Sequence, residues 1–346
     1  MNIAFKGAGL TDKIGKVTSG YSGSLHYQDT FVFHVKSFDI FMSRSRSYAD
    51  GTILSNASNT VNAQIIKALL CYYAVSSDFP EIDKISIIRE RSGQPDYSYN
   101  ECSTFVQPII GHAFRNMAYK KDVADILMED SLKGQSLRIA MTYWLKGIAS
   151  NDEYYKFDHL WRAFNRIFMY HGNNSKEFEC LRTMRQFILI NSSSFPKTLS
   201  VTNNLTKDEF HSFRWARMIL NDYDTREKNQ ALVDFVCRYH DGRIMDLFEE
   251  KLVCRKDFLQ ADKNDLYKTV ENHIISNKGV KADAELVSLL SIKYAYYIRN
   301  KFFHAEMADG TFKIKPNNID VEMKKLNEIL ETLIFELVEN NKLLRD

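Results

Sequence analysis

The stretch "YYKFDHLWRAFNRIFMY", residues 154–170, decides the fold class of this chain. Its apolar side chains recur at steps of three and four residues, which gathers them on one face of an α-helix. The members of this stripe are Phe157, Leu160, Trp161, Phe164, Ile167 and Phe168. Asn151 or Asp152 could cap the start of the helix, and the glycine of "HGNN" is a typical stop. The stretch therefore predicts a long helix that packs its rings into a core.

Helical spacing continues over most of the chain from about residue 104 to the end. Further helices are predicted for "LRIAMTYWLKGIAS", "DEFHSFRWARMIL", "EKNQALVDFVCRYH", "GRIMDLFEEKLV", "DAELVSLLSIKYAYYIRNKFFH" and "NIDVEMKKLNEILETLIFELVENNKLL". Residues 191–210, "NSSSFPKTLSVTNNLTKDEF", differ from these because they are rich in Ser, Thr and Asn. That composition is typical of loops, so we expect a surface insertion or a flexible lid there.

The first part of the chain has a different pattern. "TFVFHVKSF" alternates Phe31, Phe33 and Val35 with other side chains, which predicts a half-buried strand. "VNAQIIKALLCYYAV" predicts a helix, and "DKISIIRER" predicts a second strand. We therefore expect a mainly α protein with two domains: a smaller N-terminal α+β domain at residues 1–130 and a helical domain at 131–346.

Composition limits the functional classes. The chain is 45% hydrophobic and 26% charged, as in ordinary globular proteins, and its net charge is only +2. Nucleic acid would therefore have to be contacted by a local patch. The sequence lacks an apolar run of about 18 residues and a signal-peptide core, so we expect a cytoplasmic protein away from membranes. Its five cysteines and nine histidines are scattered, so we expect no metal site and no cofactor.

One short stretch, "YYIRNKFFHAE" at residues 296–306, combines groups that can do chemistry. Asn300 and His304 are four residues apart and share a helix face, and Arg299 flanks that face. Histidine transfers protons near neutral pH, and arginine binds phosphate through two parallel hydrogen bonds. Together they suit metal-free RNA cleavage. His304 would assist attack by the ribose 2′-hydroxyl or protonate the leaving 5′-oxygen, and Arg299 would stabilise the phosphorane.

Basic residues surround this stretch. Besides Arg299 they are Lys293, Lys301, Lys313 and Lys315, and only Glu306 and Asp309 oppose them between residues 293 and 315. We expect these lysines to contact the phosphates of RNA. The alternative from the residues alone is a solvated helix end whose cations complement the helix dipole.

The same residues carry a resemblance to a known family. "IRNKFFHAE" resembles the Arg-x-x-x-x-His signature of the HEPN superfamily. "SLRIAMTYWLKGIASNDEYYKFDHLWRAFNRIFMY" is similar to the paired opening helices of ApeA-like HEPN domains, whose Leu-Trp-x-Ala core is matched by Leu160, Trp161 and Ala163. The resemblance covers about residues 135–346. It implies a C-terminal HEPN-like helical bundle, a homodimer, and metal-independent endoribonuclease activity in phage defence, toxin–antitoxin systems or RNA processing.

The resemblance also implies roles for single residues. Arg299 and His304 match the catalytic pair, and Asn300 matches the polar position after the arginine. Many relatives carry an acidic residue in the second helix; Asn165 stands about there, which leaves Asn165 or Asp158 as the candidate helper. Glu306 replaces a tyrosine that some HEPN toxins carry, so a nucleotidyltransferase antitoxin is not the partner we expect.

Two alternatives to an active nuclease stay open. The chain could be a non-catalytic HEPN-like module that binds RNA or a nucleotide, or a structural protein in which Arg299 and His304 hold a helix end. If it is a nuclease, a regulatory trigger or an inhibitor protein is expected as a further partner, because an unrestrained ribonuclease harms its host. The N-terminal domain would then sense the trigger or select the RNA.

Overall fold

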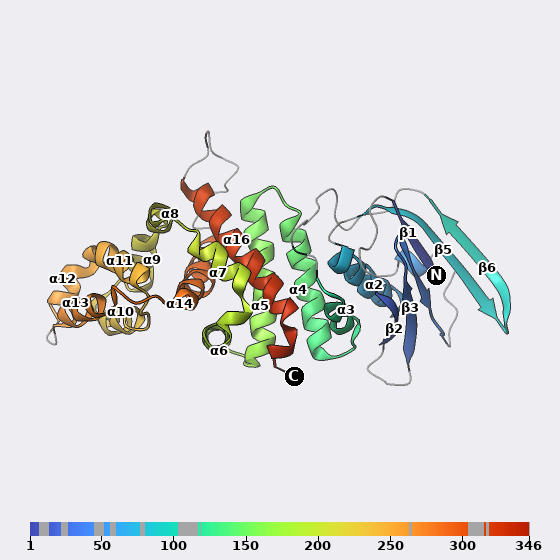
Figure 1. The fold of residues 1–346 in the computed structure, drawn as a ribbon, viewed down its shortest axis with the longest axis horizontal. Coiled ribbons are helices and arrows are strands. Elements are labelled where there is room, and N and C mark those ends of the chain that lie inside the picture. Colours follow the sequence, from blue (N-terminus) through green and yellow to red (C-terminus); the bar gives the residue numbers. More distant parts are fainter. Residues whose placement is uncertain are drawn as a thin grey trace. The chain divides into compact units, whose positions relative to one another are not determined.

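The computed structural model describes residues 1–6, 14–21, 27–44, 52–55, 60–76, 80–102, 117, 119–262, 265–303, 315 and 318–345. The chain is mostly helical, with an antiparallel sheet in its N-terminal part and a helical C-terminal region, as the sequence predicts (Figure 1). No helix of the described ranges combines the length and apolarity needed to cross a membrane.

The chain forms two compact units. The first comprises Met1–Asn151, Arg162–Tyr170 and Leu337–Asp346, and the second comprises Asp152–Trp161 and His171–Glu336. Two long helices, α5 (Glu153–Gly172) and α16 (Asn318–Glu339), therefore contribute residues to both units. The domain limits expected from the sequence, 1–130 and 131–346, remain predictions.

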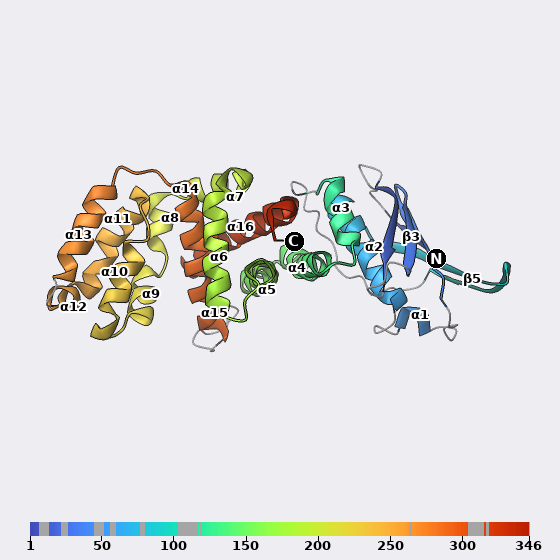
Figure 2. The same cartoon turned by 90° about the horizontal axis from the view of Figure 1, so that it is seen from below.

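The first unit is built on a six-stranded sheet. Its strands are β1 (Asn2–Phe5), β2 (Gly15–Gly20), β3 (Gln28–Phe33), β4 (Ser37–Phe41), β5 (Ile82–Arg91) and β6 (Gln94–Glu101). They lie in the order β2-β3-β4-β1-β5-β6, and all neighbours are antiparallel. Helix α2 (Thr60–Ser76) covers one face (Figure 2), where Tyr72 stacks on Phe5 with ring centroids 4.2 Å apart.

The single strand predicted for residues 30–38 is wrong, because the chain turns back within it. Strand β3 ends at Phe33 and β4 begins at Ser37, and the amide of His34 donates to the carbonyl of Ser37 at 2.8 Å. Phe33 pairs with Phe38 across this hairpin, and both rings are buried. A straight strand would place Phe33 and Phe38 on opposite faces, because side chains alternate. Burial of both rings therefore favours the turn, and it leaves Val35 exposed.

Four more helices of the described residues belong to the first unit, besides parts of α5 and α16. They are α1 (Thr52–Ser55), α3 (Lys121–Met128), α4 (Leu132–Ile148) and η5 (Asn341–Leu343). Helix α4 matches the helix predicted before residue 150. Ser131 caps it by accepting a hydrogen bond from the amide of Gly134 at 3.0 Å.

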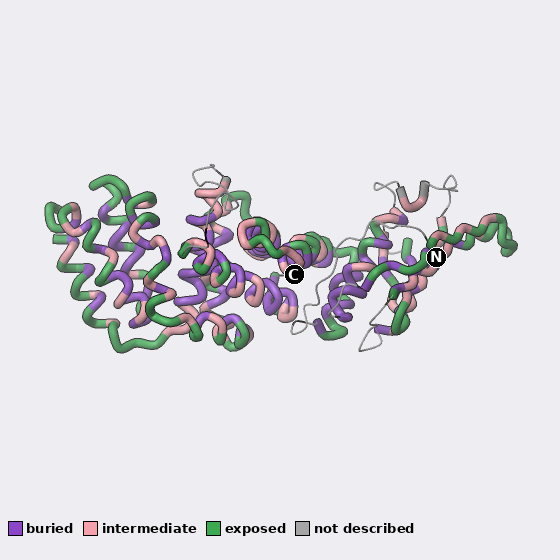
Figure 3. The backbone as a smooth tube through the Cα atoms, turned by 90° about the horizontal axis from the view of Figure 1, so that it is seen from above, coloured by how far each residue is buried: buried purple, intermediate pink, exposed green. Residues whose placement is uncertain are grey.

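The second unit consists of helices in its described residues. Besides parts of α5 and α16, they are α6 (Glu177–Ile190), η1 (Ser192–Ser194), α7 (Pro196–Asn203), α8 (Lys207–Ser212), α9 (Trp215–Asp222), η2 (Arg226–Lys228), α10 (Asn229–Val236), α11 (Gly242–Lys251), η3 (Leu252–Arg255), α12 (Lys256–Gln260), α13 (Leu266–Asn277), α14 (Asp283–Ser288), η4 (Leu289–Tyr294) and α15 (Ala295–Phe303). Helices α9 to α13 lie side by side (Figure 2), and buried residues follow their inner sides (Figure 3).

The expected loop or lid at residues 191–210 is helical, so that prediction is wrong. Pro196 starts α7 at a position where its missing N–H costs nothing. The buried carboxylate of Glu336, from α16, accepts hydrogen bonds from the amides of Lys197 and Thr198 at 2.7 and 2.9 Å. Thr206 and Glu209 form a reciprocal capping box at the start of α8. These caps turn a segment of loop-like composition into two short helices.

Helix α5 follows its prediction at both ends. Asp152, one of the two predicted caps, accepts a hydrogen bond from the amide of Tyr155 at 2.7 Å. The helix stops after Gly172, but the left-handed residue is Asn173, with φ +44°. Asparagine tolerates this conformation better than most residues.

Candidate functional site

The candidate site lies on α15, which continues directly from a π-helical segment. That segment, η4 (Leu289–Tyr294), is one of the rarer helical forms and is frequently found at functional sites. Four of its apolar or aromatic side chains, Leu289, Leu290, Ile292 and Tyr294, are buried. The core thus fixes the helix on which Arg299, Asn300 and Lys301 stand.

A buried polar network anchors η4 to its neighbours. Glu322 of α16, whose side chain is 2% exposed, accepts hydrogen bonds from the guanidinium of Arg214 at 3.0–3.1 Å and from the hydroxyl of Tyr294. The amide of Arg214 donates to the Tyr294 hydroxyl at 2.8 Å. Burial and the neighbouring Glu322 carboxylate raise the pKa of Tyr294 well above its usual value, which keeps this phenol protonated.

Arg299 and Asn300 are in direct contact. Nη1 of Arg299 donates to Oδ1 of Asn300 at 2.9 Å, and both residues are half-buried. The Arg299 guanidinium carbon lies 6.0 Å from the ring centroid of Tyr296. The side-chain amide of Asn300 therefore orients the guanidinium of Arg299.

Aromatic contacts pair α15 with the first half of α5. Tyr154 meets Phe302 edge to face with ring centroids 5.3 Å apart, and Phe157 lies 5.8 Å from the same ring. One turn further along α5, Trp161 lies 6.0 Å from Tyr296. The stripe predicted from the sequence of α5 thus packs partly against the helix that carries Arg299.

By helix geometry, we expect Arg299 on the side of α15 that faces α5, and Asp158 on the side of α5 that faces α15. Arg299 is three residues from both Tyr296 and Phe302, so it lies between them on α15. Asp158 follows Tyr154 by four residues and is half-buried, with its carboxylate 3.8 Å from Nδ1 of His159. Asn165 lies seven residues later on the same side of α5, about 10 Å along the helix axis. Asp158 therefore lies nearer than Asn165 to the level of Arg299, and the helper role of either residue remains a prediction.

Two of the predicted RNA-binding lysines contact the C-terminal end of α9. The ammonium of Lys293 pairs with Asp222 at 2.6 Å, and that of Lys301 donates to Oδ1 of Asn221 at 2.5 Å. Lys315 is exposed. The sequence pointed to the lysines but not to their partners, because nothing marks the dipeptide at 221–222 as a neighbour of residues some seventy to eighty positions away.

Several predicted residues lie outside the described part of the chain. They are the catalytic candidate His304, the RNA-binding candidate Lys313, and the two acidic residues of that stretch, Glu306 and Asp309. Their roles remain predictions.

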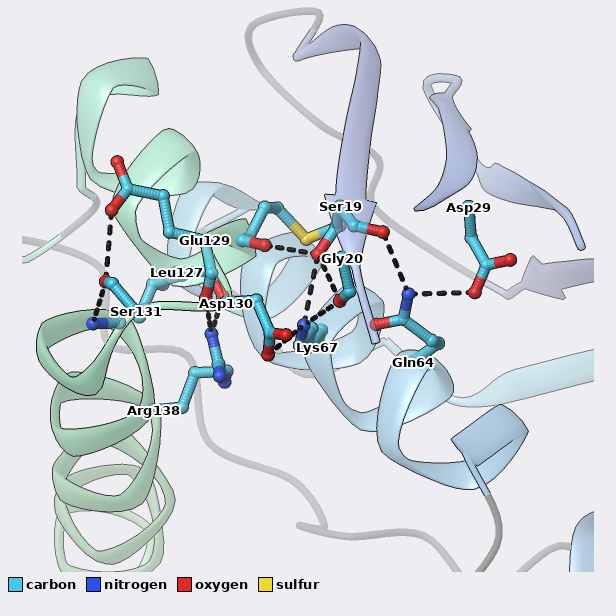
Figure 4. Close-up of polar contacts among 12 residues, drawn as sticks. Ser19, Gly20, Asp29, Gln64, Lys67, Leu127, Glu129, Asp130, Ser131 and Arg138 are labelled. Carbon is cyan, nitrogen blue, oxygen red and sulfur yellow. Dashed lines mark hydrogen bonds and ion pairs between the residues drawn. The ribbon is translucent and has the colours of Figure 1, made fainter. Parts of the chain in front are cut away.

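A second polar cluster, in the first unit, brings a serine and a lysine together (Figure 4). Lys67 donates to Oγ of Ser19 at 3.1 Å and to the carbonyl of Gly20 at 2.7 Å, and it pairs with Asp130 at 3.5 Å. Burial lowers the pKa of Lys67. The Ser19 hydroxyl donates to the carbonyl of Met128, and Ser19 and Lys67 are at most 5% exposed. A nucleophilic serine needs access to substrate, so the cluster serves to tie β2 and α2 to the α3–α4 junction.

Comparisons with known proteins add no relative. A scan against protein-family models gave no match, and searches of curated proteins and of solved structures returned no significant similarity. Among the described residues, no three His, Cys, Asp or Glu side chains are grouped as a metal ion requires. The case for a function therefore depends on the chemistry of the residues on and after α15.

Proposed function

We propose that this chain is a metal-independent endoribonuclease of the HEPN type. The observation that carries the proposal is the contact on α15 in which Asn300 orients the half-buried guanidinium of Arg299. A guanidinium held in this way is suited to bind a phosphate and to stabilise the charge that builds up on it. His304, from the same stretch of sequence, would supply the proton transfer.

Three further features support the proposal. The segment containing Arg299 follows a π-helix and packs on the α5 helix that carries the matching Leu160, Trp161 and Ala163. Asp158 lies on the facing side of α5. The mechanism uses the ribose 2′-hydroxyl as nucleophile, so RNA is the substrate and DNA of the same sequence is not. We expect a homodimer, with RNA as the ligand.

The test is cleavage of transfer RNA in EDTA. The wild type should cut, and Arg299→Ala and His304→Ala should each lower the rate by about 10²-fold or more. His34→Ala is the matched histidine control: His34 pairs with Asp39 at 2.8 Å in the first unit, so this variant should cut like the wild type. Circular dichroism of each variant would show that it is folded.

Two outcomes would contradict the nuclease. If His304→Ala cuts as fast as the wild type, the assignment of the proton-transfer group is wrong. If the wild type binds RNA in a gel-shift assay without cutting it, the chain is the non-catalytic binding module instead.

A further inference from the structure

Two arginines of the second unit meet at the C-terminal end of α10. The guanidinium carbon of Arg185, from α6, lies 5.2 Å from the ring centroid of the buried Tyr239. Nη2 of Arg185 also donates a hydrogen bond to the carbonyl oxygen of Arg238 at 3.1 Å. Arg238 directly follows Cys237, the C-cap of α10, and is exposed. The fold thus brings together two cations that lie 53 positions apart in the sequence.

Lys293 reaches the same place from η4. Its ammonium nitrogen lies 5.1 Å from the ring centroids of both Tyr223 and Phe235. The Phe235 ring in turn lies 5.6 Å from the ring of Tyr223 and 5.6 Å from the ring of Tyr239. Lys293 and Arg185 therefore lie against neighbouring rings of one buried aromatic layer.

The charges of all three cations act on the phenols of this layer. Burial raises the pKa of Tyr239, and the positive charges of Arg185, Arg238 and Lys293 oppose that rise. Burial also raises the pKa of Tyr223, and the charge of Arg238 opposes that rise as well. We call Arg185, Arg238 and Lys293 the α10 cluster.

The α10 cluster carries more positive charge than its partners neutralise. Asp222 pairs with Lys293 at 2.6 Å. Within the described part of the chain, no carboxylate pairs with Arg185 or Arg238. Arginine binds phosphate through its planar fork of N–H groups, which makes a phosphate the anion that suits this cluster. The rings beneath the cations are buried, so the cluster offers charge to a nucleic-acid backbone and no stacking surface to a base.

The α10 cluster is close enough to the candidate site to share one RNA strand with it. Lys293 and Arg299 are six residues apart on the helix formed by η4 and α15, which corresponds to about 9 Å along the helix axis. A nucleic-acid strand advances by about 3.4 Å per nucleotide in a regular helix. A few nucleotides therefore span the distance between the two groups.

We propose that the α10 cluster is a second phosphate-binding site for the RNA strand, a few nucleotides from the phosphate that is cleaved. Arg238 contacts the phosphate, while the contacts of Arg185 and Lys293 hold their charges beside it. The site binds the backbone and does not distinguish bases. This inference rests on the proposed function, because it names how the same substrate is held beyond the point of cleavage.

The test is RNA binding by the full chain, measured by fluorescence anisotropy with short fluorescein-labelled 2′-O-methyl RNAs, which lack the nucleophile and stay intact. Losing one phosphate contact on a single strand changes the slope of log K against log salt by about 0.7, which corresponds to about five-fold in affinity at about 0.1 M salt. Arg238→Gln should show both changes. The loss should be the same for oligouridine and for oligocytidine, because a phosphate contact carries no base information.

Two further variants make the test specific to position and charge. Arg226→Gln removes the same charge from an exposed arginine at the opposite end of α10, and it should leave the salt slope unchanged. Arg238→Lys keeps the positive charge and should keep the salt slope of the wild type. Arg185 bonds to the main-chain carbonyl of residue 238, which every variant retains, so melting temperatures should stay close to that of the wild type.

The outcomes separate this inference from the function beneath it. If Arg238→Gln keeps the wild-type salt slope, or if Arg226→Gln changes the slope as much, the second phosphate site is wrong; cleavage of transfer RNA by the wild type in EDTA would then still support the nuclease. If only Arg238→Gln changes the slope but the wild type does not cut, the phosphate site is supported and the nuclease fails. If the wild type neither binds the 2′-O-methyl RNAs nor cleaves transfer RNA, both proposals fail.

Discussion

The cap that Glu336 places on α7 gives a prediction that can be worked out from the structure. The carboxylate accepts from the amides of Lys197 and Thr198 at 2.7 and 2.9 Å, and from the Thr198 hydroxyl at 2.6 Å. Replacing Glu336 with alanine removes all three bonds. Lys197 is exposed, so water can satisfy its amide, but Thr198 is fully buried.

The expected loss follows from the two buried donors of Thr198. A buried donor without an acceptor costs about 1–3 kcal/mol. Burial raises the pKa of Glu336, because desolvation disfavours the charged carboxylate; this desolvation offsets part of the stabilisation from the three hydrogen bonds. We therefore expect Glu336→Ala to lower the free energy of local opening of α7 by about 3 kcal/mol.

Hydrogen exchange of peptides from α7 is the suitable assay, because two compact units need not unfold together. Glu339→Ala is the matched control on the same helix. Glu339 pairs at 3.7 Å with Lys120, whose side chain is 78% exposed, so its loss should cost less than about 1 kcal/mol. If Glu336→Ala changes exchange of α7 no more than Glu339→Ala does, the capping role of Glu336 is wrong.

The raised pKa of Glu336 also sets the sign of a pH dependence. A carboxyl group that binds its proton more tightly when folded contributes stability at pH values below its unfolded value of about 4.5. That contribution is lost as the pH rises through the higher folded-state pKa. Glu336→Gln cannot titrate, so the melting temperature of the wild type should fall relative to this variant across that window. Parallel pH profiles of the two proteins would contradict the pKa shift.

Two further predictions concern packing and buried charge. We expect Gly172→Ala to lower the free energy of unfolding in urea by about 2 kcal/mol or more, because a Cβ at residue 172 would lie 2.6 Å from the backbone of α6. Gly279→Ala is the control: nothing lies within 4 Å of the added Cβ, so the free energy of unfolding should stay nearly unchanged. Lys67→Met should destabilise the first unit by about 2 kcal/mol, because it removes the hydrogen bonds of a buried ammonium to the Ser19 hydroxyl and the Gly20 carbonyl; urea unfolding that matches the wild type would show that this ammonium contributes nothing.

The sequence predicted elements whose signal is local and missed those whose signal is distant. The α5 stripe, the α2 helix and the β5 strand were predicted because each has enough residues to show its period. Strand β1 is four residues long, and β6 is largely exposed and begins "QPD", so neither shows a buried alternation that stands out. The α7 segment was misjudged because its cap, Glu336, lies more than a hundred residues away.

The same difference between local and distant signals applies to the residues of the candidate site. Arg299, Asn300 and Lys301 could be proposed from the sequence because they are adjacent and belong to a residue set with a known chemistry. Asn221 and Asp222 were missed because the dipeptide has no motif of its own, and only the fold brings it to Lys301 of α15 and Lys293 of η4. A pattern along the chain can identify groups that react or bind, but their partners depend on packing.

The π-helical turn explains why the orientation of Arg299 could not be read from periodicity. A π-turn holds more residues than an α-turn, so it rotates every later side chain relative to an uninterrupted α-helix. Buried Leu290 and Ile298, on either side of the end of η4, are fixed by the core. Extrapolating α-helical spacing from Leu290 would therefore place Arg299 at the wrong angle. The contacts of Tyr296 and Phe302 with α5 fix the angle of α15, and Arg299, three residues from each of them, lies on the same side of this helix.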